Sequence, residues 1–300
     1  MIDRPAKAAP RLAFPAMLTG SAMLAFGPWM VRLADVPPMT SAFWRLALAI
    51  IPLLVLARIV AGSNAAVTQG LDRRTVAAIA LAGVFFASDL AVWHLGILRT
   101  TMANATLLSN AASFLLPIWG FTVLRQRPGR RALVAIALAF IGTLLLVGQS
   151  AEMSAEHVIG DLFCLAAAIF YTGYLIVVDR VRGRIAALPL LALSTTAGAV
   201  ALLPLALAQA PFWPGDWTPL LMLAIGSQVI GQGLVVYAVG HLRPLVVGLS
   251  LLIQPAISAT VGALRFGEIP GGLAITGAAL VVAALVLVRL PERTSQPQRD

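Results

Sequence analysis

Long apolar stretches alternate along the sequence with short segments rich in Pro, Gly and Arg. Roughly 20 mostly apolar residues are what an α-helix needs to cross the hydrocarbon core of a bilayer. Ten stretches of this kind are found at 12–32, 40–60, 76–97, 103–124, 131–148, 158–178, 188–208, 217–240, 244–264 and 271–290. They are continuously apolar and do not alternate with polar residues, which argues against the strands of a β-barrel. The pattern predicts an all-α integral membrane protein with ten transmembrane helices.

Composition supports this interpretation. Hydrophobic residues make up 60% of the 300 residues, charged residues only 11%, and the mean hydropathy is +0.92. Soluble domains are about one quarter charged, so this chain needs a lipid bilayer as its solvent. A soluble enzyme, a DNA-binding domain and a disordered chain are thereby excluded. The net charge of +9 would otherwise suggest a nucleic-acid partner, and we expect none.

The basic residues are unevenly distributed between the segments that join the predicted spans. With the N-terminus in the cytoplasm, 17 of the 21 Lys and Arg residues fall on cytoplasmic segments and three on the opposite side, while Arg45 lies within a span. Cytoplasmic segments of membrane proteins carry an excess of Lys and Arg. We therefore expect both termini in the cytoplasm, as tails at 1–11 and 291–300.

The two halves of the chain resemble each other. A shift of 144 residues places 96–99 (Gly-Ile-Leu-Arg) over 240–243 (Gly-His-Leu-Arg). The halves 12–148 and 158–290 then hold five spans each. An odd number of spans makes the second half enter the membrane from the opposite side. Such inverted repeats are common in secondary transporters, where substrate binds between the halves.

Segments of both halves resemble a known family. Residues 95–108 (Leu-Gly-Ile-Leu-Arg-Thr-Thr-Met-Ala-Asn-Ala-Thr-Leu-Leu), followed by Pro117, resemble the signature of spans 3 and 4 in the drug/metabolite transporter superfamily, EamA type. Residues 248–255 (Gly-Leu-Ser-Leu-Leu-Ile-Gln-Pro) and 267–268 (Gly-Glu) are similar to the pattern of its second copy. In this sequence Gln254 replaces the usual Glu before Pro, and Arg125-Gln126 replaces the first Gly-Glu.

The resemblance covers about 12–290. It implies a basket-like fold in which two inverted five-helix repeats surround a central cavity. Within the family the chain is most similar to amino-acid and metabolite exporters, including the YddG-like aromatic amino-acid exporters. Mechanisms that need an acid at the replaced positions are not expected here.

Two polar stripes occupy corresponding places in the repeats. Thr106, Asn110 and Ser113 fall on one face of a helix in the first half, and the same shift places Ser250 and Gln254 over Thr106 and Asn110. Polar residues within spans tend to face the protein interior or a water-filled path. The stripes predict either the lining of a shared cavity or hydrogen bonds between helices.

Asp89 is an acid well inside the third predicted span, with Trp93 one turn away and His94 next to it. Charged groups in this environment are rare and usually functional or paired. Arg45 is predicted at the same outer half of the membrane. Asp89 is expected to form a structural ion pair with Arg45, to couple transport to protons, or to contact a substrate amine.

Aromatic, Met and amide side chains on other spans complete the candidate cavity. An aromatic amino acid or similar amphipathic metabolite would suit a flat, partly apolar pocket with a few polar anchors. Ordinary helix packing and an interfacial aromatic belt are the alternatives for these residues. The candidates are Met23, Phe26, Met30, Tyr171, Tyr174, Gln228, Gln232 and Tyr237.

Proline and small residues suggest hinges and close helix contacts. Pro28, Pro117 and Pro255 are candidate kinks, since proline frees a carbonyl within a helix. Small residues on spans 131–148 and 271–290 predict a close helix contact, either within a monomer or between two chains of a homodimer.

The motifs of several enzyme classes are missing. The sequence has no P-loop and no His-Glu-x-x-His motif, and its three His and single Cys form no metal-like cluster. No enzymatic activity, cofactor or metal is therefore expected.

The leading hypothesis is a secondary transporter in a bacterial inner membrane that exports small amphipathic metabolites, first neutral and aromatic amino acids, by alternating access. The alternatives are broad efflux of toxic organic compounds, a membrane-embedded enzyme and a non-transporting scaffold.

Overall fold

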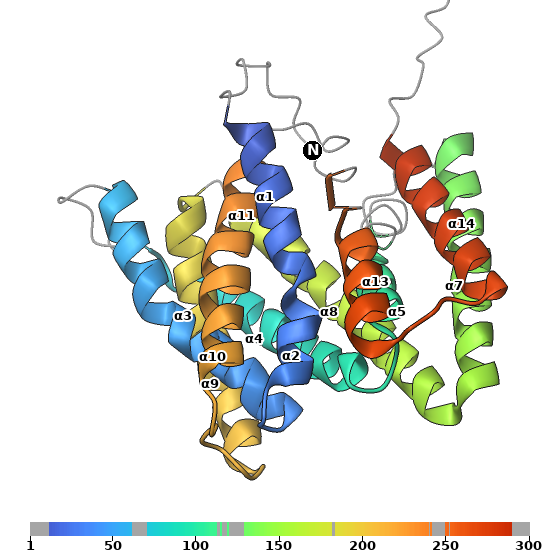
Figure 1. Ribbon diagram of the computed structural model, residues 1–300. Helices are drawn as coiled ribbons and strands as arrows, with labels where there is room; N and C mark the ends of the chain where they lie inside the picture. Colours follow the sequence, from blue (N-terminus) through green and yellow to red (C-terminus); the bar gives the residue numbers. More distant parts are fainter. Residues whose placement is uncertain are drawn as a thin grey trace, which may run out of the picture.

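The computed structural model describes residues 12–61, 71–112, 115, 119, 129–181, 184–239, 241, 250–251 and 253–289 (Figure 1). Within these ranges the chain forms helices and no strands. The helices are α1 (Ala13–Ala25), α2 (Gly27–Leu33), α3 (Pro38–Ala61), α4 (Arg73–Ile97), α5 (Met102–Ser109), α7 (Arg130–Met153), α8 (Ala155–Val181), α9 (Ala187–Leu207), α10 (Thr218–Leu221), the π-helix η1 (Met222–Gly231), α11 (Gln232–Val239), α13 (Ile253–Phe266) and α14 (Gly272–Arg289).

The all-helical membrane fold is confirmed. Among the described residues, seven helical segments are long and apolar enough to cross a membrane, and Gly272–Ala284 is a shorter apolar helix. The predicted spans 103–124 and 244–264 lie partly outside the described residues, as do Ser113 and Pro117. Ten spans and cytoplasmic termini remain predictions.

The first predicted span is broken at Phe26, between α1 and α2. Pro28 lies in the first turn of α2, where its missing N–H costs no helical hydrogen bond. The hydroxyl of Ser258, on α13, donates a hydrogen bond to the carbonyl of Ala25 at 2.9 Å. A helix of the second half thus satisfies a carbonyl at the break in the first.

The eighth predicted span also departs from a regular α-helix, because ten of its residues form η1. π-Helical segments are rare and are often found at functional sites, since they shift the direction of the side chains that follow. η1 places Ser227 and Gln228 inside the protein, both almost completely buried.

Helices of the first half pack against helices of the second. α4 makes its most extensive contacts with α8 and also packs on α9, while α3 lies against α9, α5 against α13, and α7 against α14. The α7–α14 pair uses the small residues that the sequence singled out. Gly142 and Gly277 bring the two backbones together, because a Cβ on either would lie within 3 Å of the other's carbonyl oxygen. The predicted contact therefore exists within one chain.

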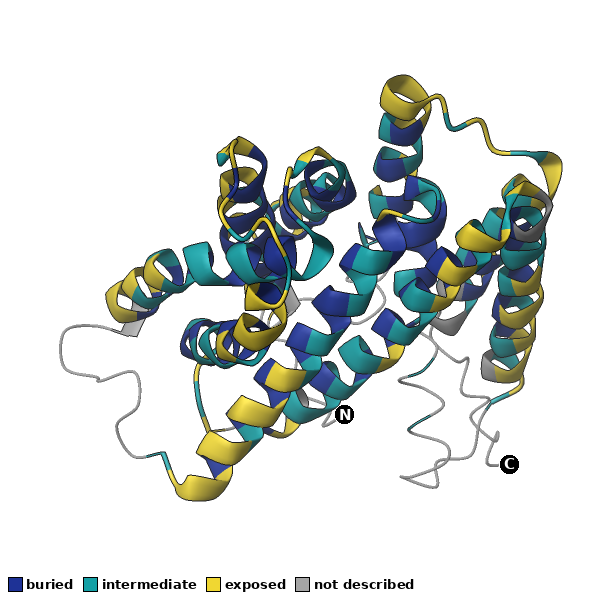
Figure 2. Cartoon of the chain, turned by 90° about the horizontal axis from the view of Figure 1, so that it is seen from below, coloured by how far each residue is buried: buried dark blue, intermediate teal, exposed yellow. Residues whose placement is uncertain are grey.

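Apolar side chains also cover much of the outer surface. Ile51, Phe140, Val200 and Leu264 are at least half exposed, and exposed positions lie on the outward faces of the helices (Figure 2). Lipid is the natural neighbour of such a surface.

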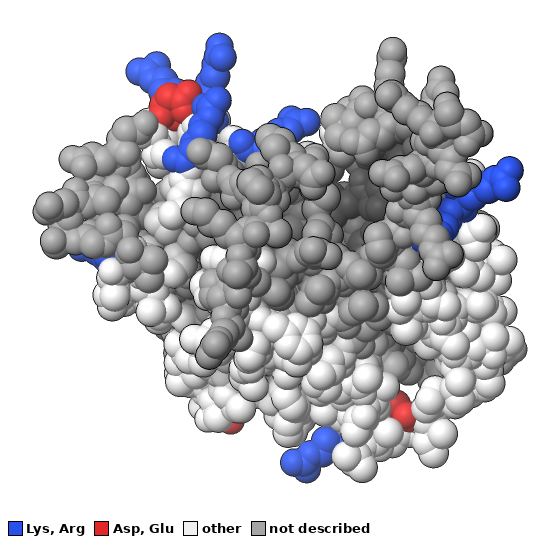
Figure 3. All heavy atoms as spheres, turned by 90° about the horizontal axis from the view of Figure 1, so that it is seen from above, with Lys and Arg blue, Asp and Glu red and all other residues white. Residues whose placement is uncertain are grey.

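In the view from above, most of the visible Lys and Arg side chains lie at the edges of the molecule (Figure 3). Asp72 caps α4 by accepting a hydrogen bond from the backbone N–H of Thr75, and it pairs with the exposed Arg184 at 3.5 Å. The hydrogen bonds from Thr75, with a smaller contribution from Arg184, lower the pKa of Asp72.

The α7–α14 contact gives a test of the packing. A methyl group added at Gly142 would lie 2.7 Å from the carbonyl oxygen of Gly277, whereas at Gly148, on the same helix, it would meet nothing within 4 Å. We expect Gly142→Ala to lower the free energy of unfolding by about 1–3 kcal/mol. Gly148→Ala should be neutral or stabilising by about 0.5–1 kcal/mol. Unfolding of the detergent-purified variants measures both, and equal effects would contradict this packing.

Candidate functional site

Two opposite charges lie in the interior where the halves meet. Arg45 on α3 is 3% exposed and Asp89 on α4 is 8% exposed. The guanidinium of Arg45 lies over the ring of Trp93, 5.7 Å from its centroid. Its Nε donates a hydrogen bond of 3.4 Å to Oε1 of Gln228 on η1. Helices of both halves therefore place polar groups around Arg45.

The expected direct ion pair between Arg45 and Asp89 is not formed. Their charged atoms are close enough to attract each other. The ion pairs within 4.0 Å among the described residues, however, join Arg32 to Glu268 and Arg184 to Asp72. Arg45 instead turns toward Gln228 and Trp93. No hydrogen bond joins Asp89 to any other residue that the structure describes.

Amide and hydroxyl groups of the second half complete this cluster. Gln228 is fully buried, and its amide nitrogen donates to the hydroxyl of Thr195, on α9, at 3.3 Å. Gln232, one turn further on, is within hydrogen-bond reach of Tyr171 on α8. Both glutamines therefore bond to neighbouring helices, and a role in lining a cavity stays a prediction.

Aromatic rings border the cluster on the α4 and α8 side. Tyr171 and Tyr174 stack with ring centroids 5.7 Å apart, and Tyr174 stacks on Phe86 at 4.9 Å. Asp89 interacts electrostatically with both tyrosines. The cluster therefore combines a cation, an anion, amides and aromatic surfaces.

Four buried side-chain atoms of the described residues lack a hydrogen-bond partner. They are Nη1 of Arg45, Nε2 of His94, Oγ of Ser227 and Oγ of Ser21. His94 interacts electrostatically with Arg45, and its Nδ1 shares a hydrogen bond of 2.7 Å with Ser41. Ser227 precedes Gln228 in sequence. Because buried polar groups are nearly always partnered, these unsatisfied atoms mark a place where water or a ligand can bind.

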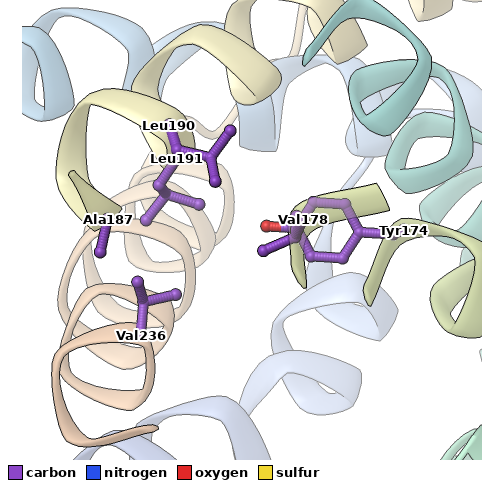
Figure 4. Close-up of a pocket in the computed structure, with 6 residues that line it drawn as sticks. All are labelled: Tyr174, Val178, Ala187, Leu190, Leu191 and Val236. Carbon is purple, nitrogen blue, oxygen red and sulfur yellow. The ribbon is translucent and has the colours of Figure 1, made fainter. Parts of the chain in front are cut away.

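A pocket lies between α8, α9 and α11 (Figure 4). Tyr174 and Val178 form one wall, and residues of α9 and α11 face them across the empty space. The remaining lining residues are Ala187, Leu190, Leu191 and Val236. Its walls are mostly apolar, and Tyr174 is the residue that it shares with the aromatic border of the cluster.

The other sequence candidates are more scattered. Met30 is buried in the apolar core, and Met23 and Phe26 are half-buried on the first span. Thr106 and Asn110 hydrogen-bond to carbonyls of their own helix. Ser250 is buried and Gln254 half-buried on the ninth predicted span. Tyr237 is 39% exposed and packs on His241, outside the cluster.

A second buried network was missed in the sequence. The carboxylate of Asp161, on α8, accepts hydrogen bonds from Thr100 at 2.5 Å, from Ser150 at 2.7 Å and from the amide of Asn104 at 3.2 and 3.3 Å. Asp161 is an acid inside a predicted span, as Asp89 is, and that signal was sufficient to find it. Its donors satisfy it completely, which indicates a structural role.

A third polar contact joins the halves at the end of the bundle where α2 and α13 finish. Nη1 of Arg32 pairs with Oε1 of Glu268 at 2.5 Å, and Arg32 also donates to the carbonyls of Ile97 and Thr100. Glu268 accepts a further hydrogen bond from the backbone N–H of Met102 at 2.8 Å. The side chains are only 14% and 17% exposed, so this end is closed by a well-satisfied ion pair.

Metal binding has little support within the described ranges, where no group of three or more His, Cys, Asp or Glu residues is placed to hold an ion.

The Asp161 network predicts a specific loss of stability. Asp161→Asn replaces an acceptor with an amide donor that faces the Thr100, Ser150 and Asn104 donors. We expect the free energy of unfolding to fall by about 1–3 kcal/mol. Glu156→Gln, in the exposed first turn of the same helix, is the matched control and should change it little. If both variants unfold alike in detergent, the network does not stabilise the fold.

Comparison with known proteins identifies the family to which this chain belongs. The model of the EamA-like transporter family matches residues 11–148 and 158–290. A protein of Archaeoglobus fulgidus named as an uncharacterized transporter is 24% identical over 264 residues, covering 86% of this chain and 89% of its own length. The pseudopaline exporter CntI of Pseudomonas aeruginosa is 23% identical over 220 residues, covering 72% of this chain and 76% of its own.

A solved crystal structure shares the fold, with a TM-score of 0.64, 20% sequence identity, and coverage of 94% of this chain and 97% of the other. The family match spans nearly all of the chain, and the named relatives are transporters. The protein is thus a multi-pass membrane protein that belongs to the EamA-like transporter family.

Proposed function

We propose that the protein is a secondary transporter that exports small amphipathic metabolites, with neutral and aromatic amino acids as the first candidates. The observation that carries this proposal is the Arg45–Asp89 cluster, which lies buried between helices of the two halves and is incompletely paired. Charged groups within a membrane are costly and are usually kept for function. A transporter uses such groups to bind a polar substrate in place of water.

The arrangement of the helices supports alternating access between two inverted repeats. Three of the packed pairs, α3–α9, α5–α13 and α7–α14, each join predicted spans that occupy the same position in the two halves. This is the pairing that a two-fold axis in the membrane plane would produce. In our proposal the halves rock about the central cluster, with both termini in the cytoplasm.

The two ends of the bundle differ in a way that supports an inward-open resting state. The Arg32–Glu268 contact closes one end, whereas the pocket beside Tyr174 extends toward the beginning of α9 and the end of α11, at the opposite end (Figure 1). We propose that the pocket is the cytoplasmic entrance and that the contact seals the outer side of a bacterial inner membrane.

The chemistry of the cluster and one relative support the substrate class. Tyr171, Tyr174 and Trp93 offer flat apolar surfaces beside the charges, which suits an amphipathic body. The relative CntI is named as a pseudopaline exporter. Efflux of toxic organic cations would use the aromatic surfaces and Asp89 but would leave Arg45 without a role.

Flux through proteoliposomes that contain only this protein tests the proposal. Labelled tryptophan, phenylalanine and threonine should show saturable counterflow and compete with one another, whereas a cationic dye should not. Dye flux without amino-acid flux would favour broad efflux. An absence of any flux in well-folded protein would contradict the transport proposal and favour the scaffold.

If the Arg32–Glu268 contact closes the outer end, a variant that breaks it should change the rate of transport without changing substrate affinity. Glu268→Gln keeps an acceptor for the Met102 N–H but removes the ion pair, which weakens the closed outer end. We expect the dissociation constant for phenylalanine to change less than about twofold. The rate of phenylalanine flux should change by about tenfold, because an ion pair of this kind contributes on the order of 1 kcal/mol to the closed state.

Glu156→Gln, an exposed charge removed from α8, is the control for net charge. Equal losses of binding and flux in Glu268→Gln would place Glu268 in the substrate site and contradict its role in closing the outer end.

A further inference from the structure

The charges of the Arg45–Asp89 cluster indicate a more specific class of ligand. This inference rests on the transport function proposed above. We infer that the cluster binds a small zwitterion, whose carboxylate pairs with Nη1 of Arg45 and whose ammonium pairs with the carboxylate of Asp89. The geometry points to one ligand group for each unpaired protein charge.

The first step is that both charges are buried and incompletely used. Arg45 is 3% exposed, yet its Nη1 has no hydrogen-bond partner, and its Nε makes only a long bond of 3.4 Å to Gln228. Asp89 is 8% exposed and accepts no hydrogen bond from the part of the chain that the structure describes. Interior charges normally have partners, because their loss of hydration is costly.

The second step is that the two charges are neighbours that do not neutralise each other directly. They attract each other, but no pair of their charged atoms lies within 4.0 Å. Trp93, whose ring lies against the Arg45 guanidinium, is one helical turn from Asp89 on α4, so both charges face the same region of the interior. An amino acid carries its carboxylate and ammonium on the same carbon atom, so one small molecule presents both complementary charges to the cluster.

The third step concerns the net charge of the occupied site. A zwitterion pairs Arg45 and Asp89 and adds no net charge to a low-dielectric interior. A simple cation would pair Asp89 and leave Arg45 unpaired, and a simple anion would do the reverse. Each would therefore leave the buried cluster with one net charge. The cluster should therefore discriminate against both.

The groups around the charges fit the remainder of such a ligand. Trp93 lies under the Arg45 guanidinium, and the stacked Tyr171 and Tyr174 lie beside Asp89. The unpartnered Oγ of Ser227 is buried on η1, next in sequence to Gln228. Apolar side chains of a ligand would contact the rings, while its polar end would face Arg45, Asp89 and η1.

Three probes of similar shape distinguish the carboxylate contact with Arg45 from the ammonium contact with Asp89. L-phenylalanine carries both charges, 2-phenylethylamine lacks the carboxylate, and 3-phenylpropanoate lacks the amine. Their affinities are measured by equilibrium binding to the full-length protein in detergent. The wild-type protein should bind phenylalanine about ten- to a hundredfold more tightly than either analogue, the ratio expected when a charged hydrogen-bond partner is missing.

Two variants should change this selectivity in opposite directions. Arg45→Gln should remove the preference for phenylalanine over 2-phenylethylamine, and Asp89→Asn should remove its preference over 3-phenylpropanoate. Arg45→Lys, which keeps the positive charge, should bind phenylalanine more weakly but retain the order of the three probes. This variant tests the inference even if Arg45→Gln does not fold. Arg58→Gln, exposed on the same helix as Arg45, is the matched control.

The outcomes separate this inference from the proposed function. If phenylalanine is transported but the Arg45 and Asp89 variants lose affinity equally for all three probes, the assigned contacts are wrong while transport stands. An analogue that binds wild-type protein as tightly as phenylalanine does also overturns the inference. If the wild-type protein neither binds nor transports phenylalanine, both the inference and the proposed amino-acid function fail.

Discussion

The hydrocarbon core of a bilayer provides no hydrogen-bond partners, and this constraint governs the polar groups of the fold. Most buried polar groups find partners within the chain: Thr100, Asn104 and Ser150 donate to Asp161, and Ser258 donates to the carbonyl at the break between α1 and α2. Among the described residues, Nη1 of Arg45 and Nε2 of His94, which lie close enough to interact electrostatically, are two of the four buried side-chain atoms without a partner. The proposed ligand would supply partners at this place.

The two ends of the bundle also differ in how their polar groups are paired. Glu268 and Arg32 close one end with an ion pair that is further hydrogen-bonded to Met102, Thr100 and Ile97. Shifts of 142 and 144 residues place Gln126 and Ile176 at the equivalent positions of the other half. Those residues carry no charge, so the repeat has no second copy of this ion pair. In the alternating-access cycle that we propose, this difference would favour closure of the Arg32–Glu268 end.

The positions of the long helices were predictable because lipid imposes a simple rule on apolar length, and the small residues on α7 and α14 predicted their contact for a similar reason. The interior of the site was only partly predictable. Asp89, Arg45, Gln228 and Gln232 were found from polarity alone, but the pairing of Arg45 depends on its rotamer and on η1, which no sequence pattern indicated. Tyr237 is 39% exposed, and its place in a cavity stays a prediction.

The central claim is that the polar interior is reached alternately by solvent and substrate. It is tested most directly by labelling a single cysteine at Ser227, in a Cys164→Ala background, with a membrane-impermeant thiol reagent applied to one side at a time. Because Ser227 is 2% exposed in this structure, the account predicts slow labelling from the side of the termini, limited by opening of the bundle, and protection by phenylalanine. A thiol that reacts from neither side, in protein that is folded and inserted, would mean that the core is sealed and would contradict the account.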